Sequence, residues 1–284
     1  MKFTYIIEEE ILIKDFLIKK GYSRNILRSI KNNLELNNQK TKIYFIAKKG
    51  DSLTVMLPIE ENSVEKEDIP LDILYEDEYL LVCNKPSKMS VMVTKAHPNK
   101  TLSNALSYYF SVNKILSFIH LVNRLDNETS GVLIVAKNAY IKALLQNDLP
   151  NIKKIYYGLV YGCVNDDSGV ISAPIAKTIN DGIKREINEE GKDSLTYFEV
   201  LKRSADYTLV KFNLATGRTH QIRLHSKMIS LGIVGDKLYA SEEEHMYLHA
   251  KELEFTHPIT KQNIKIESEL PEYFKRKIEE INWR

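Results

Sequence analysis

The chain has 284 residues, of which 43% are hydrophobic and 27% are charged, and its formal net charge is +2. With only 11 Gly and 8 Pro, this composition excludes fibrous proteins and wholly disordered chains. The length predicts either one large domain with an appendage or two comparable domains.

Cysteine usage and hydropathy indicate the compartment. Cys83 and Cys163 lie in apolar runs without the spacing of a metal site or a disulfide framework, so we expect two buried, inert thiols and a reducing environment. Three consecutive glutamates interrupt the N-terminal apolar stretch, and no apolar run approaches the roughly 18 residues of a membrane span. We therefore expect a cytoplasmic protein with no membrane partner.

Two short helices are predicted near the start of the chain. Ile13, Phe16 and Leu17 share one helical face, and Ser23 can cap the second helix. Three β-prone runs follow, LELNN, TKIYFIA and SLTVML, separated by turn signals. The sequence thus predicts a compact ααβββ module at residues 1–58.

A linker and a larger domain are predicted after this module. Residues 59–70, IEENSVEKEDIP, are acidic and poor in large apolar side chains, which is typical of a linker. Within residues 71–284, helices are expected at about 101–111, 139–147 and 218–230. The intervening strands have hairpin-like spacing, which predicts an α+β domain with a mixed, largely antiparallel sheet. They are expected in ILYED, EYLLVCN, GVLIVAK, KIYYGLVYG, LTYFEVLK, YTLVKFNL and YLHAKELEF.

The stretch 119-IHLVNRLDNETSGVLIVAKN-138 places one carboxylate, Asp126, just before a turn-forming segment. Because a strand follows the turn, we expect Asp126 on a loop at the edge of the sheet, where active-site groups are often carried. A salt bridge with Arg124, or a turn cap, is the commoner role for such a residue, and the local pattern alone favours it.

The stretch 216-TGRTHQIRLHSK-227 holds Arg218, His220, Arg223 and His225 at the start of a predicted helix. Because residues five apart point to different faces of a helix, the two histidines cannot chelate a metal together. Guanidinium groups near a helix N-terminus favour an anion such as phosphate or carboxylate, so we expect an anion site and no metal.

Three tyrosines, Tyr156, Tyr157 and Tyr161, lie in the predicted strand KIYYGLVYG. Aromatic side chains on a sheet usually pack into the core. An exposed ring beside a basic surface can instead stack on a nucleic-acid base, and the sequence leaves both roles open.

Taken together, five stretches resemble, in the same order, the motifs of the RluA-type pseudouridine synthases. They are 85-KPSKMSV-91, 124-RLDNETSGVLIVAKN-138, 154-KIYYGLVYG-162, 216-TGRTHQIRLHSKMISLGIVGDKLY-239 and 248-LHAKELEFTHP-258. The resemblance covers about residues 71–275. Residues 10–58 resemble the small S4-like (αL) RNA-binding domain that many of these enzymes carry. In agreement, residues 11–47 hold eight Lys or Arg against Asp15 and Glu35.

The resemblance implies an isomerase that converts uridine in a folded RNA to pseudouridine, without a metal or a small-molecule cofactor. The bond from the sugar to N1 is cut and a new bond to C5 is made. Asp126 matches the essential aspartate, which acts as the covalent or proton-transfer catalyst. Arg223 matches the arginine that pairs with this aspartate. Tyr156 matches the tyrosine that stacks on the detached uracil and takes part in removing the C5 proton.

RNA contacts are implied as well. Arg124 resembles the arginine that follows the flipped nucleotide or contacts its phosphates. Lys85, Lys154 and Arg218 are assigned to phosphate contact or to site structure. The helices of the N-terminal module add Lys14, Lys20, Arg24 and Arg28. Asn123 stands where the family usually has histidine, and it can keep a hydrogen bond but cannot carry a proton.

The expected substrate is ribosomal RNA of the large subunit, with transfer RNA as the second candidate, and the protein is expected to act as a monomer. The rival hypothesis is a non-catalytic RNA-binding or ribosome-assembly protein on the same fold. Intact Asp126, Tyr156 and Arg223 weigh against this rival, because a retired active site is free to lose them.

Overall fold

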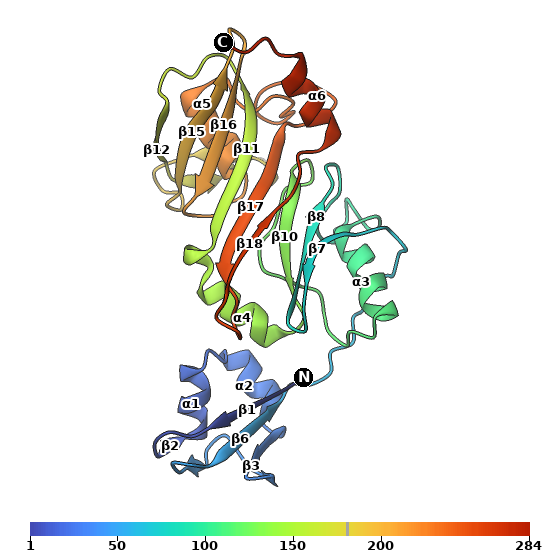
Figure 1. The fold of residues 1–284 in the computed structure, drawn as a ribbon, viewed down its shortest axis with the longest axis vertical. Helices are drawn as coiled ribbons and strands as arrows, with labels where there is room; N and C mark the ends of the chain where they lie inside the picture. Colours follow the sequence, from blue (N-terminus) through green and yellow to red (C-terminus); the bar gives the residue numbers. More distant parts are fainter. Residues whose placement is uncertain (180–181) are drawn as a thin grey trace.

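The computed structural model describes residues 1–179 and 182–284, which form a small N-terminal module and a large domain (Figure 1). An extended segment joins them, between the last strand of the module, which ends at Met56, and the first strand of the large domain, which begins at Asp72. None of the described helices is long and apolar enough to cross a bilayer.

The N-terminal module begins with a strand that the sequence did not predict. This strand, β1 (Lys2–Ile6), pairs antiparallel with β6 (Ser52–Met56) at the other end of the module. Such a pairing depends on the distant partner strand, so local propensity carries little signal for it. Of the run TKIYFIA, which was predicted as a strand, only the last two residues form one, β5. The other strands are β2 (Ile11–Leu12), β3 (Leu34–Leu36), β4 (Gln39–Lys40) and β5 (Ile46–Ala47).

The two helices of the module, α1 (Ile13–Lys19) and α2 (Arg24–Ile30), are confirmed. The apolar face predicted for α1 is buried, and the Ser23 side chain accepts a hydrogen bond from Ile26 N at the start of α2. The polar faces, which carry the predicted RNA-binding cations, are left at the surface.

The large domain is built on one ten-stranded sheet and a separate two-stranded hairpin. The strands are β7 (Asp72–Glu76), β8 (Leu80–Lys85), β9 (His120–Leu121), β10 (Ser130–Ala136), β11 (Lys153–Tyr161), β12 (Ser168–Ser172), β13 (Ile175–Lys177), β14 (Arg185–Ile187), β15 (Leu195–Arg203), β16 (Tyr207–Leu214), β17 (Leu248–Thr256) and β18 (Asn263–Glu267). The sheet runs β12-β15-β16-β11-β17-β10-β8-β7, with β18 on β17 and β9 on β10. Only the β10–β17 pair is parallel within the described residues, which confirms the α+β class with a mixed, largely antiparallel sheet.

Four α-helices of the described residues belong to the large domain: α3 (Leu102–Val112), α4 (Ala139–Asn147), α5 (Gln221–Ile229) and α6 (Glu272–Glu280). The first two match the predicted ranges. The third begins later than residue 218, because His220 adopts a left-handed backbone with φ 59°, which a helix cannot include. The last was not predicted, since only Phe274 anchors its charged sequence in the core. Figure 1 shows α4 at the end of the sheet that faces the N-terminal module.

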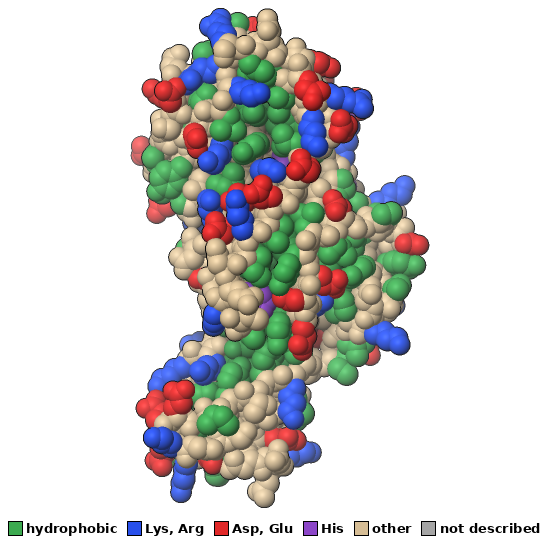
Figure 2. Space-filling model, viewed as in Figure 1, with side chains coloured by type: hydrophobic (Ala, Val, Ile, Leu, Met, Phe, Trp, Pro, Cys, Tyr) green, Lys and Arg blue, Asp and Glu red, His purple; other side chains and the backbone are tan. Residues whose placement is uncertain are grey.

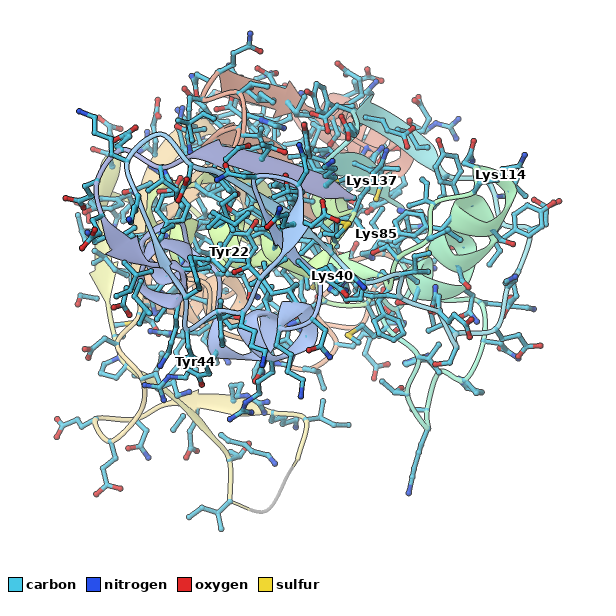
Figure 3. All side chains as sticks on the ribbon, turned by 90° about the horizontal axis from the view of Figure 1, so that it is seen from below. Tyr22, Lys40, Tyr44, Lys85, Lys114 and Lys137 are labelled. Carbon is cyan, nitrogen blue, oxygen red and sulfur yellow. The ribbon has the colours of Figure 1, made fainter. Side chains whose placement is uncertain are left out.

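Aromatic side chains pack the module against the large domain. The rings of Tyr22 and Tyr140 are stacked with their centroids 3.9 Å apart, and the Tyr140 hydroxyl donates to Lys20 O at 2.8 Å. Gly21 has φ +90°, a backbone conformation that favours glycine, and a Cβ there would lie 2.5 Å from Leu144 Cδ2 of α4. One hydrophobic core runs through both bodies. Figure 3 views the molecule from this end, with Tyr22 labelled.

The expectation of two buried thiols holds for one cysteine only. Cys83 is buried in β8, whereas Cys163 is exposed. Cys163 follows the end of β11, and Gly162 before it has φ +81°, so the chain has already turned out of the sheet when it reaches the thiol. The apolar run before Cys163 therefore predicts the buried strand, but it does not predict burial of the cysteine that follows the strand.

Candidate active site

Asp126 lies on the loop between β9 and β10, as predicted, and two side chains hold this loop. Asn123 Oδ1 accepts a hydrogen bond from Ile134 N at 2.8 Å, so this residue keeps the local hydrogen bond expected of it. The Lys85 ammonium at the end of β8 donates to Asn127 O at 3.0 Å. The backbone next to Asp126 is therefore tied to both β8 and β10.

A glycine at the start of β10 brings this loop close to β17. Gly131 has φ +115°, and a Cβ at this position would lie 2.2 Å from Ala250 O. No other residue fits such an approach without moving the strands apart. Gly131 therefore pairs in parallel with Ala250, and this contact fixes the position of the strand end that follows the Asp126 loop.

Arg223, in the first turn of α5, is fixed by two carboxylates. Its Nε and Nη2 donate to Asp236 Oδ2 and Oδ1 at 2.8 and 2.7 Å. Its Nη1 donates to Asp126 Oδ2 at 3.2 Å. Burial lowers the pKa of Arg223, but Asp236 and then Asp126 raise it by more, so the guanidinium stays charged. A charge-assisted hydrogen bond of this kind holds the Asp126 carboxylate in one orientation.

Tyr156 and Asp126 line the same small cavity, together with apolar side chains such as Leu214 and Leu248. Tyr156 lies in β11, and only 8% of it is exposed. Burial raises the pKa of the Tyr156 phenol, and the Asp126 carboxylate raises it further, so the phenol is protonated at neutral pH. The cavity thus combines an aromatic ring, apolar surface and a carboxylate. Such a lining suits a planar base attached to a polar sugar.

His220 connects the Asp126 loop to a second tyrosine. Its Nε2 lies 3.8 Å from Asp126 Oδ2, and its Nδ1 lies 2.8 Å from the Tyr239 hydroxyl. That hydroxyl accepts from Arg185 N at 2.8 Å, so its own hydrogen can be donated to Nδ1. Burial lowers the pKa of His220 despite the nearby Asp126, which favours the neutral ring with its proton on Nε2, facing the carboxylate.

The sequence model of a family described as RNA pseudouridylate synthase matches residues 79–227, a span that includes Asp126, Tyr156 and Arg223. The uncharacterized RNA pseudouridine synthase YjbO of Bacillus subtilis (strain 168) is 33% identical over 270 residues, which cover 92% of this chain and 95% of that protein. The chain belongs to the RNA pseudouridine synthase family. It is therefore an isomerase whose substrate is RNA.

Two further comparisons support this family and its fold. The ribosomal large subunit pseudouridine synthase D of Pseudomonas aeruginosa is 35% identical over 227 residues, which cover 73% of this chain and 71% of that protein. The solved structure of human RNA pseudouridylate synthase domain containing 1 has a TM-score of 0.60 at 26% identity, and the match covers 75% of this chain and 87% of that one. The expected RluA-type catalytic domain is confirmed.

In this pseudouridine synthase, the cations predicted to bind RNA near the cavity differ in exposure. Arg124 and Arg218 are exposed and line the cavity mouth, where β14 adds Arg185, which the sequence analysis did not single out. Lys154 is buried, donates to Leu149 O at 3.1 Å and has its pKa lowered by burial. It lines the same opening from below the surface.

Lys85 has a different setting from the other predicted RNA contacts. Its side chain has no exposed surface, and its ammonium donates to three backbone carbonyls, those of Pro86, Met89 and Asn127. Burial lowers the pKa of Lys85 to about 7, although Asp126 opposes this shift. An enclosed ammonium cannot reach a phosphate, so the direct RNA contact proposed for Lys85 is wrong. The alternative role in site structure fits the geometry.

The dense run of basic residues at the start of α5 does not act as one site. Arg218, His220 and Arg223 reach the cavity, whereas His225 points into the core. His225 Nδ1 lies 2.8 Å from Thr196 Oγ1 and its Nε2 lies 3.0 Å from Ala173 O. The helical period explains the division, because His225 is on the opposite face from the residues that face Asp126.

Asp236 is the functional residue that the sequence analysis missed. It lies within GIVGDKLY, at the end of the fourth stretch that resembles the family's motifs. Gly235 before it has φ +76°, and a Cβ there would lie 1.8 Å from His245 O, so this turn needs glycine. The Gly235-Asp236 pair was the available signal: a turn glycine next to an acidic residue inside an apolar stretch. Its partner Arg223 could not be deduced from spacing.

Proposed function

We propose that this pseudouridine synthase modifies ribosomal RNA of the large subunit, with transfer RNA as the second candidate. Proteins named ribosomal large subunit pseudouridine synthase D, from Pseudomonas aeruginosa and Xanthomonas campestris, are 35% and 31% identical to this chain and support the choice. We also propose that the protein acts as a monomer. We place its action in the cytoplasm, where ribosomes are assembled.

The observation that carries the proposal is the Asp126 carboxylate, held by Arg223 beside Tyr156 in one cavity. In this proposal, a uridine enters the cavity and Asp126 acts at its sugar, either by attacking the sugar or by removing a sugar proton. The bond from C1′ to N1 breaks, the uracil rotates, and a bond from C1′ to C5 forms. The C5 proton then leaves, and N1 carries a proton in the product.

Tyr156 and Arg223 have separate roles in this scheme. The Tyr156 ring stacks on the detached uracil and limits its movement while the base rotates. Its raised pKa makes the phenol a weak base at neutral pH, so any part it takes in removing the C5 proton depends on close positioning. Arg223 orients the carboxylate and balances its charge.

The target uridine has to leave its base stack before it can reach this cavity. Arg124 is exposed at the cavity mouth, where it can occupy the space that the flipped base leaves or contact the neighbouring phosphates. Arg218 and Arg185 line the same opening and add positive charge to it. Lys20, Arg24 and Arg28 are exposed and Lys14 is half-buried on the N-terminal helices, where we propose further phosphate contacts.

The face of the large domain that is seen in Figure 2 offers a contrast. There, lysines and glutamates of β17 and β18 alternate and pair with one another, as Lys265 does with Glu252 at 3.1 Å and with Glu267 at 2.7 Å. A surface neutralised in this way has little attraction for phosphate. This supports RNA approaching the opposite face, where α5 lies behind the sheet in Figure 1.

The test compares the wild-type protein with Asp126→Asn on unmodified ribosomal and transfer RNA. Pseudouridines are mapped by carbodiimide adducts and reverse-transcription stops. We expect new stops with wild type alone, because asparagine is almost isosteric but cannot act as a carboxylate. Asp166→Asn, an exposed residue outside the cavity, is the matched control and should keep full activity.

Each other outcome has a definite meaning. Turnover by Asp126→Asn would reject the catalytic assignment. Stops in transfer RNA alone would replace the proposed substrate with the second candidate. If the wild type binds RNA but makes no stops, even with ribosomal assembly intermediates, the chain is a non-catalytic RNA-binding protein on this fold.

A further inference from the structure

The loop that leads into β5 and the first residue of that strand expose three consecutive apolar side chains. Tyr44 is 70% exposed, Phe45 55% and Ile46 54%. Single apolar residues on a surface are ordinary, but a run of three or more is unfavourable unless it has a binding function. Two of the three side chains are aromatic, so the surface they form is flat as well as apolar.

The backbone under these side chains is held in place. Ile13 N donates to Phe45 O at 3.0 Å and Lys14 N donates to Ile43 O at 2.8 Å, so the loop satisfies two of the free N–H groups at the start of α1. The next residues form β5, which pairs with β2. The rings are therefore presented by an ordered backbone, and a ligand that binds them loses less affinity to ordering of the loop.

Positive charge surrounds the two rings. Lys40, Lys42 and Lys48 are exposed and line one hollow with Tyr44 and Phe45. Across the described residues, none of these three ammonium groups forms a salt bridge. Exposed aromatic rings interleaved with lysines that form no salt bridge match a ligand with flat bases and an anionic backbone.

Two nearby charged side chains, Lys14 and Asp51, also bear on the binding of an anionic ligand. The Lys14 ammonium lies 5.9 Å from the centroid of the Tyr44 ring, so one positive charge already adjoins the stacking surface. Asp51 also lines the hollow, but its oxygens accept hydrogen bonds from Asn37 Nδ2 and Lys48 N, both at 2.8 Å. The Asp51 carboxylate is thus bound to groups of the module itself.

The hollow lies on the same side of the molecule as the catalytic opening. Figure 3 looks along the long axis, and both Tyr44 and the pale yellow ribbon that contains β13 and β14 lie toward its lower edge. Arg185 of β14 lines the opening in which Asp126 lies. One RNA molecule that runs along this side can therefore reach both places.

We propose that Tyr44 and Phe45, with Lys40, Lys42 and Lys48, form a stacking platform for unpaired bases of the substrate RNA. The platform binds a single-stranded segment apart from the uridine that enters the cavity. The proposal rests on the proposed function in one respect, namely that the RNA on the platform is the RNA being modified. It adds a preference for a target whose uridine lies near an unpaired loop or end.

The test uses the full chain and a Tyr44→Ala/Phe45→Ala double variant. Binding of a labelled, mixed-sequence single-stranded RNA is measured by anisotropy, beside a duplex of the same sequence. We expect the double variant to bind the single strand about 25-fold more weakly, because each of the two rings contributes a factor of about five by stacking on one base. Its affinity for the duplex should stay almost unchanged. Tyr197→Ala, which removes a 44% exposed ring on β15, is the control and should bind both RNAs as wild type does.

Salt dependence separates stacking from phosphate contact. The double variant should bind more weakly at every salt concentration without a change in slope, because stacking releases no counterions. Lys40→Gln/Lys42→Gln should instead lower the slope of log affinity against log salt by about 1.4, at about 0.7 for each single-strand phosphate contact. Both altered pairs are exposed, so the midpoint of urea unfolding should stay at the wild-type value.

Two outcomes overturn the platform. The first is wild-type affinity of the double variant for single-stranded RNA. The second is an RNA-free wild type that sediments as a dimer and a double variant that sediments as a monomer with full RNA affinity, which makes this surface a contact between copies. If instead the double variant loses affinity while the wild type leaves every uridine of ribosomal and transfer RNA unmodified, the proposed function fails and the platform stands as an RNA-binding surface.

Discussion

Arg223 binds both carboxylate oxygens of Asp236, at 2.8 and 2.7 Å, and presents its third nitrogen to Asp126 at 3.2 Å. Arg223, which orients the Asp126 carboxylate, is therefore itself oriented by a second carboxylate, whose side chain has no exposed surface. The position of Asp126 thus depends on a buried ion pair between α5 and the loop that follows it.

Asp236→Asn should weaken this arrangement without removing a contact to RNA. Breaking a buried pair leaves the Arg223 charge partly uncompensated, so we expect the free energy of unfolding to fall by about 3 kcal/mol. We also expect kcat to fall about ten-fold or more at unchanged RNA affinity, because a displaced guanidinium no longer holds Asp126. Urea unfolding and single-turnover kinetics measure the two effects. Asp206→Asn, an exposed change, is the control; wild-type values for Asp236→Asn would mean that Asp236 does not position Arg223.

Tyr156→Phe should separate stacking from proton transfer. Phenylalanine keeps the ring but lacks the hydroxyl, so RNA affinity should stay within about two-fold of wild type while kcat falls about ten-fold or more. Release of tritium from RNA labelled at uridine C5 follows the proton directly. Tyr156→Ala should lower the rate further, because stacking is lost as well. Wild-type tritium release by Tyr156→Phe would remove the hydroxyl from the mechanism.

His249 should make stability depend on pH. Its two ring nitrogens lie 2.8 and 2.7 Å from Ser130 Oγ and Ser268 Oγ, and burial lowers its pKa to about 4. The unfolded chain, with an ordinary histidine pKa, binds a proton first as pH falls below about 6.5, so stability drops from there toward pH 4.

From pH 8 to pH 5 we expect a loss of about 2 kcal/mol from this residue, measured by urea unfolding at each pH. His249→Gln can keep hydrogen bonds to both serines but cannot be protonated, so it should lose about 2 kcal/mol less than wild type over the same range. Equal losses in the two proteins would show that His249 titrates alike in the folded and unfolded chains.

The helices of the N-terminal module should contribute phosphate contacts. Arg24→Gln/Arg28→Gln removes two exposed cations from α2, and we expect the slope of log affinity against log salt to fall by about 1.4 for a single-stranded site. Lys265→Gln, on the charge-paired face, should leave the slope unchanged. An unchanged slope in the double variant would place the RNA elsewhere on the module.

Much of the secondary structure could be predicted because its cause is local. The Ser23 cap and the apolar face of α1 each depend on residues close together in the sequence, and both are present. The prediction failed where a distant segment decides the outcome. Strand β1 exists because β6 pairs with it, and α6 is anchored by a single buried side chain, Phe274.

The site shows the same division. Asp126, Tyr156 and Arg223 were selected from motif order, and their catalytic roles stay predictions, but the structure does bring all three to one cavity. The exposure of each lysine, in contrast, could not be predicted from the sequence. Lys85 and Lys154 lie in or beside motifs that resemble a nucleic-acid enzyme, yet one ammonium is enclosed by carbonyls and the other lines the opening from below the surface.

By itself, the sequence determined the family, the mixed character of the sheet and the three residues proposed to carry the chemistry. Each of these follows from the order of residues in the chain, namely from the order of the motifs, the periodicity of the strands and the positions of the reactive groups. Only the tertiary structure decided which groups meet. The pair of Arg223 and Asp236, the enclosure of Lys85 and the outward rings of Tyr44 and Phe45 depend on how distant segments pack. Burial and distance are properties of that packing, and they determine whether a charge is paired, a proton is held or a ring is free to bind RNA.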